Sequence, residues 1–114
     1  MSDDILDASA LLGECEGDKE LLTHYVEIFT RDCTNRLPKL RAAVQDGDVQ
    51  TLKEEAHALK GGLGCLFAGA GFKTAYALEM MGADGELGEA EATLQVFETQ
   101  LQSLRQKLNE LIGS

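Results

Sequence analysis

One segment of the chain combines side chains that could carry a phosphoryl group. In the run His57-Ala58-Leu59-Lys60-Gly61-Gly62-Leu63-Gly64, a histidine precedes a lysine and three glycines within a helical pattern. A neutral imidazole offers a lone pair that can attack phosphorus without a separate base. A nearby ammonium would stabilise the charge on phosphoryl oxygens. Because glycine inside a helix costs about 1 kcal/mol relative to alanine, something other than helix stability selected this run.

A helical wheel places His57 on the solvent side of its helix. At about 100° per residue, the apolar residues of the segment fall within one arc, and His57 lies roughly 130° from its centre. Lys53, Lys60, Gly61 and Gly64 lie within roughly 60° of His57 on the same wheel. At positions 61 and 64, glycine removes the side chain that would stand beside the imidazole ring. The apolar arc comprises Val49, Leu52, Ala56, Leu59, Leu63 and Leu66, and Gly62 suits packing on that side.

Length and charge limit the class of protein. The chain has 114 residues, 44% of them hydrophobic, which suits one domain over residues 1–114 with a modest core. Twenty acidic against ten basic side chains give a formal charge of −10, which disfavours nucleic acid and anionic membranes as partners. No apolar stretch approaches the roughly 20 residues of a membrane span, and the N-terminus lacks the basic start of a secretory signal. We therefore expect a cytoplasmic protein.

Helical periodicity runs along the chain, with no convincing strand. A long helix is predicted from the N-cap Asp18 to about Gly47, bent at Pro38. The next helix is predicted from the cap Asp48 through His57 to about residue 67. A shorter one follows over about 71–80, and a last one carries an apolar stripe from about residue 87 to 111. The expected inward-facing side chains of the shorter helix are Phe72, Ala75, Tyr76 and Leu78.

Four helices with short connections predict an all-α fold, an antiparallel four-helix bundle. The bundle would occupy about residues 18–112, and about residues 1–17 would form a lead-in and a small additional N-terminal helix from about Asp7 to Glu14. The stripe of the last helix could instead mark a coiled-coil dimer. In so short a chain, this stripe is expected to pack inside the bundle and close it instead. We therefore expect a monomer.

At the His57 segment the chain resembles the histidine-containing phosphotransfer (HPt) domains of bacterial multistep phosphorelays. Their motif, a histidine followed by x-Leu-Lys-Gly, is matched by His57-Ala58-Leu59-Lys60-Gly61. Further matches are Gly17-Asp18, Gly47-Asp48 and Leu78-Glu79. The resemblance implies that His57 is phosphorylated, that Lys60 helps to hold the phosphoryl group, and that Gly61 leaves room for a partner.

The resemblance also implies what the chain works with. Such domains are phosphohistidine carriers rather than autonomous catalysts. An aspartyl phosphate on a response-regulator receiver domain is the donor and another receiver the acceptor, and the receiver supplies Mg²⁺. A hybrid sensor histidine kinase would also fit as a partner. We expect no cofactor or metal to be bound by this chain.

A receiver must bring its aspartate to His57, so its footprint should cover the exposed surface around that residue. The residues predicted there, besides Gly61, are Lys53, Glu54, Gly64, Cys65 and Ala68. The family resemblance adds apolar contacts from the leading helix and the first long helix, namely Leu11, Leu21, Tyr25 and Ile28.

The chain departs from the family pattern at several positions. The family usually has small polar residues just after the glycine of the motif, where this chain has Gly62. It has Leu-Gly-Ala where this chain has Leu66-Phe67-Ala68, and it tends to have a leucine where Gly71 stands. One hypothesis is that Phe67 and Phe72 pack inward and fill the volume that the leucine vacates. Phe67→Gly would then leave a cavity and destabilise the protein by several kcal/mol.

Two other function classes remain open from the residues alone. One is a non-phosphorylated helical binding module that docks on a receiver or kinase and regulates it, although such a module has no need of His57 and Lys60. The other is a metal or redox bundle. Two histidines and three scattered cysteines make no ligand set for it. A nucleophilic dyad of Cys65 with His57 is also excluded, because about 12 Å of helix separates the two residues.

Overall fold

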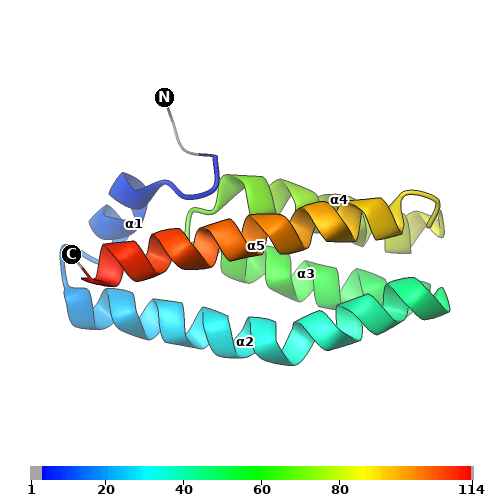
Figure 1. Ribbon diagram of the computed structural model, residues 1–114, viewed down its shortest axis with the longest axis horizontal. Coiled ribbons are helices and arrows are strands. Elements are labelled where there is room, and N and C mark those ends of the chain that lie inside the picture. The colour runs from blue at the N-terminus through cyan, green and yellow to red at the C-terminus, as the bar shows by residue number, and fades with distance from the viewer. Residues whose placement is uncertain (1–3, 114) are drawn as a thin grey trace.

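Four long helices run antiparallel in an elongated bundle, and a short helix lies at one end of it (Figure 1). The computed structural model describes residues 4–113, which contain no strand. The helices of this part of the chain are α1 (Ala8–Glu14), α2 (Lys19–Asp46), α3 (Val49–Cys65), α4 (Gly69–Asp84) and α5 (Ala90–Gly113). Helices α3 and α4, α2 and α3, α4 and α5, and α2 and α5 are in contact. The predicted all-α bundle with a small N-terminal helix is confirmed.

Aspartates cap the first three helices. The side chains of Asp7, Asp18 and Asp48 each accept hydrogen bonds from backbone N–H groups in the first turn that follows. These groups have no partner inside their own helix, so each cap stabilises a helix start. Gly47 ends α2 in the left-handed conformation, with φ at 70°, which glycine adopts without steric cost. The predicted turn at Gly47 and Asp48 is confirmed.

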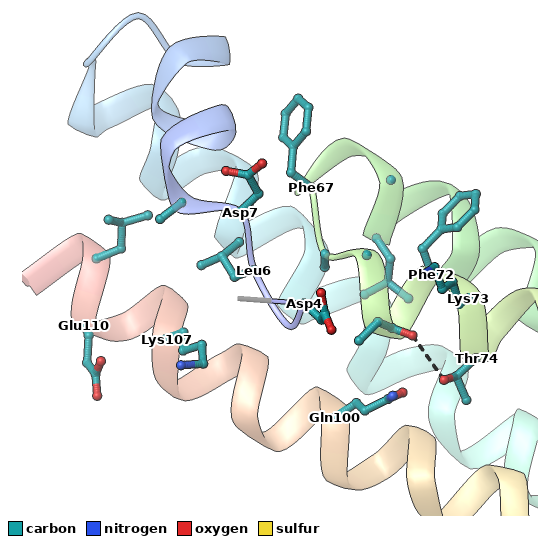
Figure 2. A pocket seen from close by; sticks show the side chains of 17 residues that line it. Asp4, Leu6, Asp7, Phe67, Phe72, Lys73, Thr74, Gln100, Lys107 and Glu110 are labelled. Carbon is teal, nitrogen blue, oxygen red and sulfur yellow. Dashed lines mark hydrogen bonds between the residues drawn. The ribbon is translucent and has the colours of Figure 1, made fainter. Parts of the chain in front are cut away.

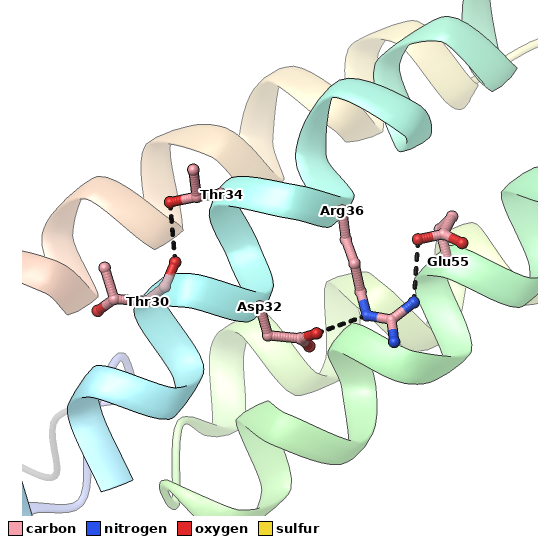
Figure 3. Close-up of polar contacts among 5 residues, drawn as sticks. All are labelled: Thr30, Asp32, Thr34, Arg36 and Glu55. Atoms are coloured by element: carbon pink, nitrogen blue, oxygen red, sulfur yellow. Dashed lines mark hydrogen bonds and ion pairs between the residues drawn. The ribbon is translucent and has the colours of Figure 1, made fainter. Parts of the chain in front are cut away.

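Charged side chains connect α2 to its two neighbours. Arg36 Nε donates to Asp32 Oδ1 at 2.8 Å, and Arg36 Nη1 donates to Glu55 Oε1 on α3 at 3.1 Å (Figure 3). Arg41 pairs with Glu98 on α5. Pro38 lies between these contacts inside α2, which continues as one helix and bends along its length (Figure 1).

Apolar stripes of the long helices meet in one core. The buried residues on α2 are Leu22, Val26, Phe29, Cys33, Leu40 and Ala43; those on α3 are Leu52, Ala56, Leu59 and Leu63; those on α5 are Ala90, Leu94, Phe97, Leu101, Leu104 and Leu108. These sets largely match the predicted stripes. Val49 is an exception, because it stands at the exposed start of α3.

The prediction for α4 is wrong in its bounds and in two of its side chains. The helix begins at Gly69 and ends at Asp84, and Phe72 and Tyr76 are 39% and 48% exposed instead of facing inward. The buried face of α4 carries mainly small residues, Gly71, Ala75, Leu78 and Gly82. A Cβ on Gly82 would lie 2.8 Å from the backbone N of Lys53 and the backbone O of Val49. Helices α3 and α4 are therefore too close for aromatic rings between them.

The inward packing predicted for Phe67 is also wrong. Helix α3 ends at Cys65, and Phe67 forms the turn with φ at 57°. The residue is 36% exposed, and its ring points away from the bundle (Figure 2). A non-glycine residue rarely adopts this left-handed conformation. Leu63 occupies the space beside Gly71, where a Cβ would lie 3.0 Å from Leu63 Cδ2. Leu63, rather than either phenylalanine, fills the volume of the missing leucine side chain.

Candidate functional site

His57 projects from the middle of α3 with 67% of its side chain exposed, as the helical wheel predicts. Its Nδ1 lies 3.0 Å from Oε2 of Glu79 on α4. The other oxygen of the same carboxylate, Oε1, lies 2.7 Å from Nζ of Lys60. Glu79 thus holds the histidine with one oxygen and the lysine with the other.

The carboxylate fixes which nitrogen of His57 is free. An ionised carboxylate only accepts hydrogen bonds, so the short contact requires that Nδ1 carries the proton and donates it to Glu79. In the neutral ring, Nε2 is then the unprotonated nitrogen. With most of the imidazole exposed, the Nε2 lone pair is available to a partner. The site presents an oriented nucleophile at the surface.

The environment keeps Glu79 ionised. The pKa of its carboxyl is lowered from the usual value, first because Lys60 donates a hydrogen bond to it and then because His57 does. Partial burial acts in the opposite direction and is outweighed. The carboxylate is therefore charged at neutral pH and can orient both neighbours.

Sequence analysis did not assign Glu79 to the site, although the pair Leu78-Glu79 contributed to the family resemblance. The position of Glu79 depends on how α3 and α4 pack against each other. Gly82 approaches the backbone of Lys53, and Phe72 lies beside Gly64. Between these two points the antiparallel register puts Glu79 opposite His57 and Lys60. Sequence spacing on a single helix does not contain that register.

The glycines after His57 serve different purposes. A Cβ on Gly61 would meet no atom of residues 4–113 within 4 Å beyond the nearby backbone of its own helix, so this side of His57 is open. A Cβ on Gly62 would lie 3.0 Å from Cδ1 of Phe29, which confirms its predicted place on the packed side. At Gly64 a Cβ would be at an ordinary contact distance of 3.5 Å from the Phe72 ring.

The residues predicted for the partner footprint do not share one surface. Lys53, Glu54, Gly64 and Cys65 are exposed on α3. Lys53 and Gly64 lie toward α4, whereas Cys65 lies toward α2. The predicted exposure of Ala68 is wrong, because this residue is 1% exposed. It follows the left-handed turn, which directs its side chain into the core ahead of α4.

Of the apolar contacts expected on the first two helices, one lies in the core instead. Leu11 is fully buried, since α1 packs its apolar side against the bundle. Leu21 and Tyr25 are half-buried, and Ile28 is exposed. Tyr25 and Ile28 line an open groove of about 570 Å³ between α2 and α3. Gly62 and Cys65 of α3 line it together with Phe67 of the following turn, and Arg31, Asp32 and Asn35 are further lining residues.

A second groove lies on another side of the molecule. It has a volume of about 1150 Å³ and is formed by the N-terminal segment, the start of α4 and the last part of α5 (Figure 2). Asp4, Lys73, Gln100 and Glu110 are among its lining residues, and His57 is not. His57 does not line the groove between α2 and α3 either; that groove reaches α3 at Gly62 and Cys65, and the second groove reaches α3 at Leu63 and Gly64.

Two of the three cysteines lie apart from this chemistry. Cys15 and Cys33 are buried, and burial raises the pKa of the Cys33 thiol to about 12, which leaves it protonated. Residues 4–113 contain no group of three or more His, Cys, Asp or Glu side chains that could hold a metal ion. Over the same residues, no helix has the length and apolar character needed to cross a membrane.

The chain is similar to known proteins both in family and in fold. The family model of the Hpt domain matches residues 24–107. The fold is similar to the crystal structure of histidine-containing phosphotransfer protein B (HptB) from Pseudomonas aeruginosa PAO1, with a TM-score of 0.88 and 28% sequence identity over 96% of this chain and 95% of that chain. No curated protein matches the sequence.

Proposed function

The chain belongs to the Hpt domain family, and from this premise we propose that His57 is the residue that carries the phosphoryl group. The family consists of histidine phosphotransfer proteins of phosphorelays, which are carriers and which interact with receiver domains and kinases. The observation that supports His57 is its hydrogen bond to Glu79, which leaves Nε2 exposed and unprotonated.

The proposed reaction is an in-line displacement at phosphorus. The Nε2 lone pair of His57 attacks the phosphoryl group of an aspartyl phosphate on a receiver domain, so an N–P bond forms while the bond from phosphorus to the aspartate oxygen breaks. The aspartate leaves as a carboxylate, and no proton has to move. The imidazolium formed keeps its Nδ1 proton, and the Glu79 carboxylate stabilises the positive charge. The reverse attack by a second receiver's aspartate passes the group on.

Lys60 is the proposed electrostatic partner of the phosphoryl oxygens. Lys60 follows His57 by about one helical turn, and its Nζ is paired with Glu79. From this position a lysine side chain can reach a phosphoryl group on His57. An ammonium stabilises the charge on a transferring phosphoryl group. We assign the Mg²⁺ of the reaction to the receiver domain, which holds the aspartyl phosphate. On this proposal the chain binds no cofactor and is no autonomous enzyme.

The receiver is proposed to dock over His57 and the groove between α2 and α3. The groove offers apolar contact from Ile28 and Phe67, and the exposed Cys65 of α3 also lines it. Gly61 leaves space beside the imidazole on the same helix. Such a surface suits a partner that must bring a bulky aspartyl phosphate against the ring. We place the exchange in the cytoplasm, the compartment expected from the sequence.

The test is transfer of a radioactive phosphoryl group. A panel of purified receivers, phosphorylated with ³²P in the presence of Mg²⁺, is incubated with the wild-type chain. We expect a label that is labile in acid and stable in base, absent in His57→Gln and retained in His24→Gln. His24 is the matched control, because it is the other histidine and is also exposed. Label on His57→Gln, or stable binding of receivers with no transfer to the wild type, would contradict the proposal.

A further inference from the structure

An exposed aromatic ring on α4 lies against the lysine of the site. The Nζ of Lys60 is 4.9 Å from the centroid of the Tyr76 ring. Tyr76 itself is 48% exposed, whereas the side chain of Lys60 is only 18% exposed although it projects from the His57 face of α3. The lysine therefore lies along the neighbouring helix and does not extend into water.

We infer that Tyr76 is a positioning residue for phosphoryl transfer: its ring holds the Lys60 ammonium beside His57 while that ammonium changes anionic partner. The inference rests on the proposed function of His57. In this role Tyr76 contacts neither the imidazole nor the proposed phosphoryl group. It acts on the transfer only by holding Lys60.

The resting contacts of Lys60 show why a second holder is needed. In the unphosphorylated chain, the ammonium is paired with Glu79 Oε1. To stabilise a phosphoryl group on His57, it has to turn from this carboxylate toward the phosphoryl oxygens. A free lysine side chain has many rotamers, so an ammonium released from Glu79 would spend much of its time elsewhere. The carboxylate alone cannot prevent this.

A ring face meets this requirement better than a second carboxylate would. The face of an aromatic ring attracts a cation through its quadrupole and carries no net charge. Its attraction tolerates sliding of the ammonium over the face, so it does not compete strongly with phosphoryl oxygens. An additional anion would hold the lysine tightly and repel the incoming phosphate. The hydroxyl of Tyr76 has no part in this contact, so phenylalanine should replace tyrosine without loss.

The structure offers a matched control on the same helix. Phe72 precedes Tyr76 by one turn of α4 and is 39% exposed. Its ring lies next to Gly64 and is not in the pair formed by Lys60 and Tyr76. Phe72→Ala therefore removes a similar exposed ring without releasing the lysine.

The experiment measures the rate of transfer from a phosphorylated receiver as the receiver concentration is varied. Tyr76→Ala should lower the maximal rate about two- to fivefold, the factor expected for an exposed cation–π contact, with no change in the half-saturating concentration. Tyr76→Phe and Phe72→Ala should match the wild type. In a Lys60→Met background, Tyr76→Ala should have no further effect. A change in half-saturating concentration alone, or an equal loss without Lys60, would overturn the inference.

A second measurement separates this inference from the proposed function. In the unphosphorylated protein, the ε-methylene protons of Lys60 should show an upfield ring-current shift in NMR spectra. The shift should persist in Tyr76→Phe and disappear in Tyr76→Ala. Absence of the shift in the wild type would overturn the positioning role. Failure of the wild type to accept label would instead overturn the proposed function, since the ring-current shift requires no phosphoryl group.

Discussion

The middle of α3 and the turn into α4 are both unusual regions of the surface. The first is unusual in its side chains and the second in its backbone conformation. Around His57 the backbone is a regular helix, and the side chains are uncommon, with the open position Gly61 next to a histidine and a lysine. At the turn the side chain of Phe67 is an ordinary apolar ring, and the backbone is uncommon, with φ at 57°. In the first region side-chain chemistry takes precedence over helix propensity. In the second an exposed ring is kept where a glycine would be unstrained.

The comparison predicts that two phenylalanines differ greatly in their contribution to stability. Phe97 is fully buried on α5, so Phe97→Ala should lower the free energy of unfolding by about 3–5 kcal/mol. Phe67→Gly should change it by no more than about 1 kcal/mol, since release from the left-handed conformation, about 1–2 kcal/mol, offsets lost contacts and the entropy cost of glycine. Urea denaturation of both variants checks this. A loss for Phe67→Gly as large as that for Phe97→Ala would restore the inward packing that the structure contradicts.

The same contrast explains what the sequence could predict. The wheel found the exposure of His57 and the packed side of Gly62 because both lie on a regular helix, where 3.6-residue periodicity sets direction. It failed at Ala68, since a single left-handed residue before it redirects the chain. It also missed Glu79, because the register between two helices depends on close approaches such as that at Gly82. Periodicity describes one helix at a time.

Two glycines of the α3 and α4 pair should respond to alanine in opposite directions. Gly82→Ala places a Cβ 2.8 Å from backbone atoms of α3, so the helices must separate, at a cost of about 1–3 kcal/mol. Gly61→Ala meets open space and should raise stability by up to about 1 kcal/mol through helix propensity. Thermal and urea unfolding measure both changes.

The functional readout of these variants sharpens the distinction. Gly61→Ala should slow phosphoryl transfer from a receiver although the protein is more stable, because the new methyl group stands beside the imidazole. If Gly61→Ala transferred at the wild-type rate, Gly61 would have no role in access. A Gly82→Ala variant as stable as the wild type would show that the close approach of α3 and α4 is not required.

The smallest expected effect concerns the pH dependence of stability at the His57 site. The pKa of Glu79 in the folded protein is lowered below its usual value of 4.5 by Lys60 and His57. The contribution of these contacts is therefore fully present above about pH 4.5 and is lost as the pH falls through the lowered pKa. Urea unfolding at neutral and acidic pH should show a smaller acid-induced loss in Glu79→Gln than in the wild type. Phe67→Gly is the control from the other region, because it alters no titratable group and should keep the wild-type pH dependence. An unchanged acid-induced loss in Glu79→Gln would mean that the carboxylate orients His57 and Lys60 without stabilising the fold. The geometry of the site would then depend on the bundle, and the site would contribute nothing to the stability of the bundle.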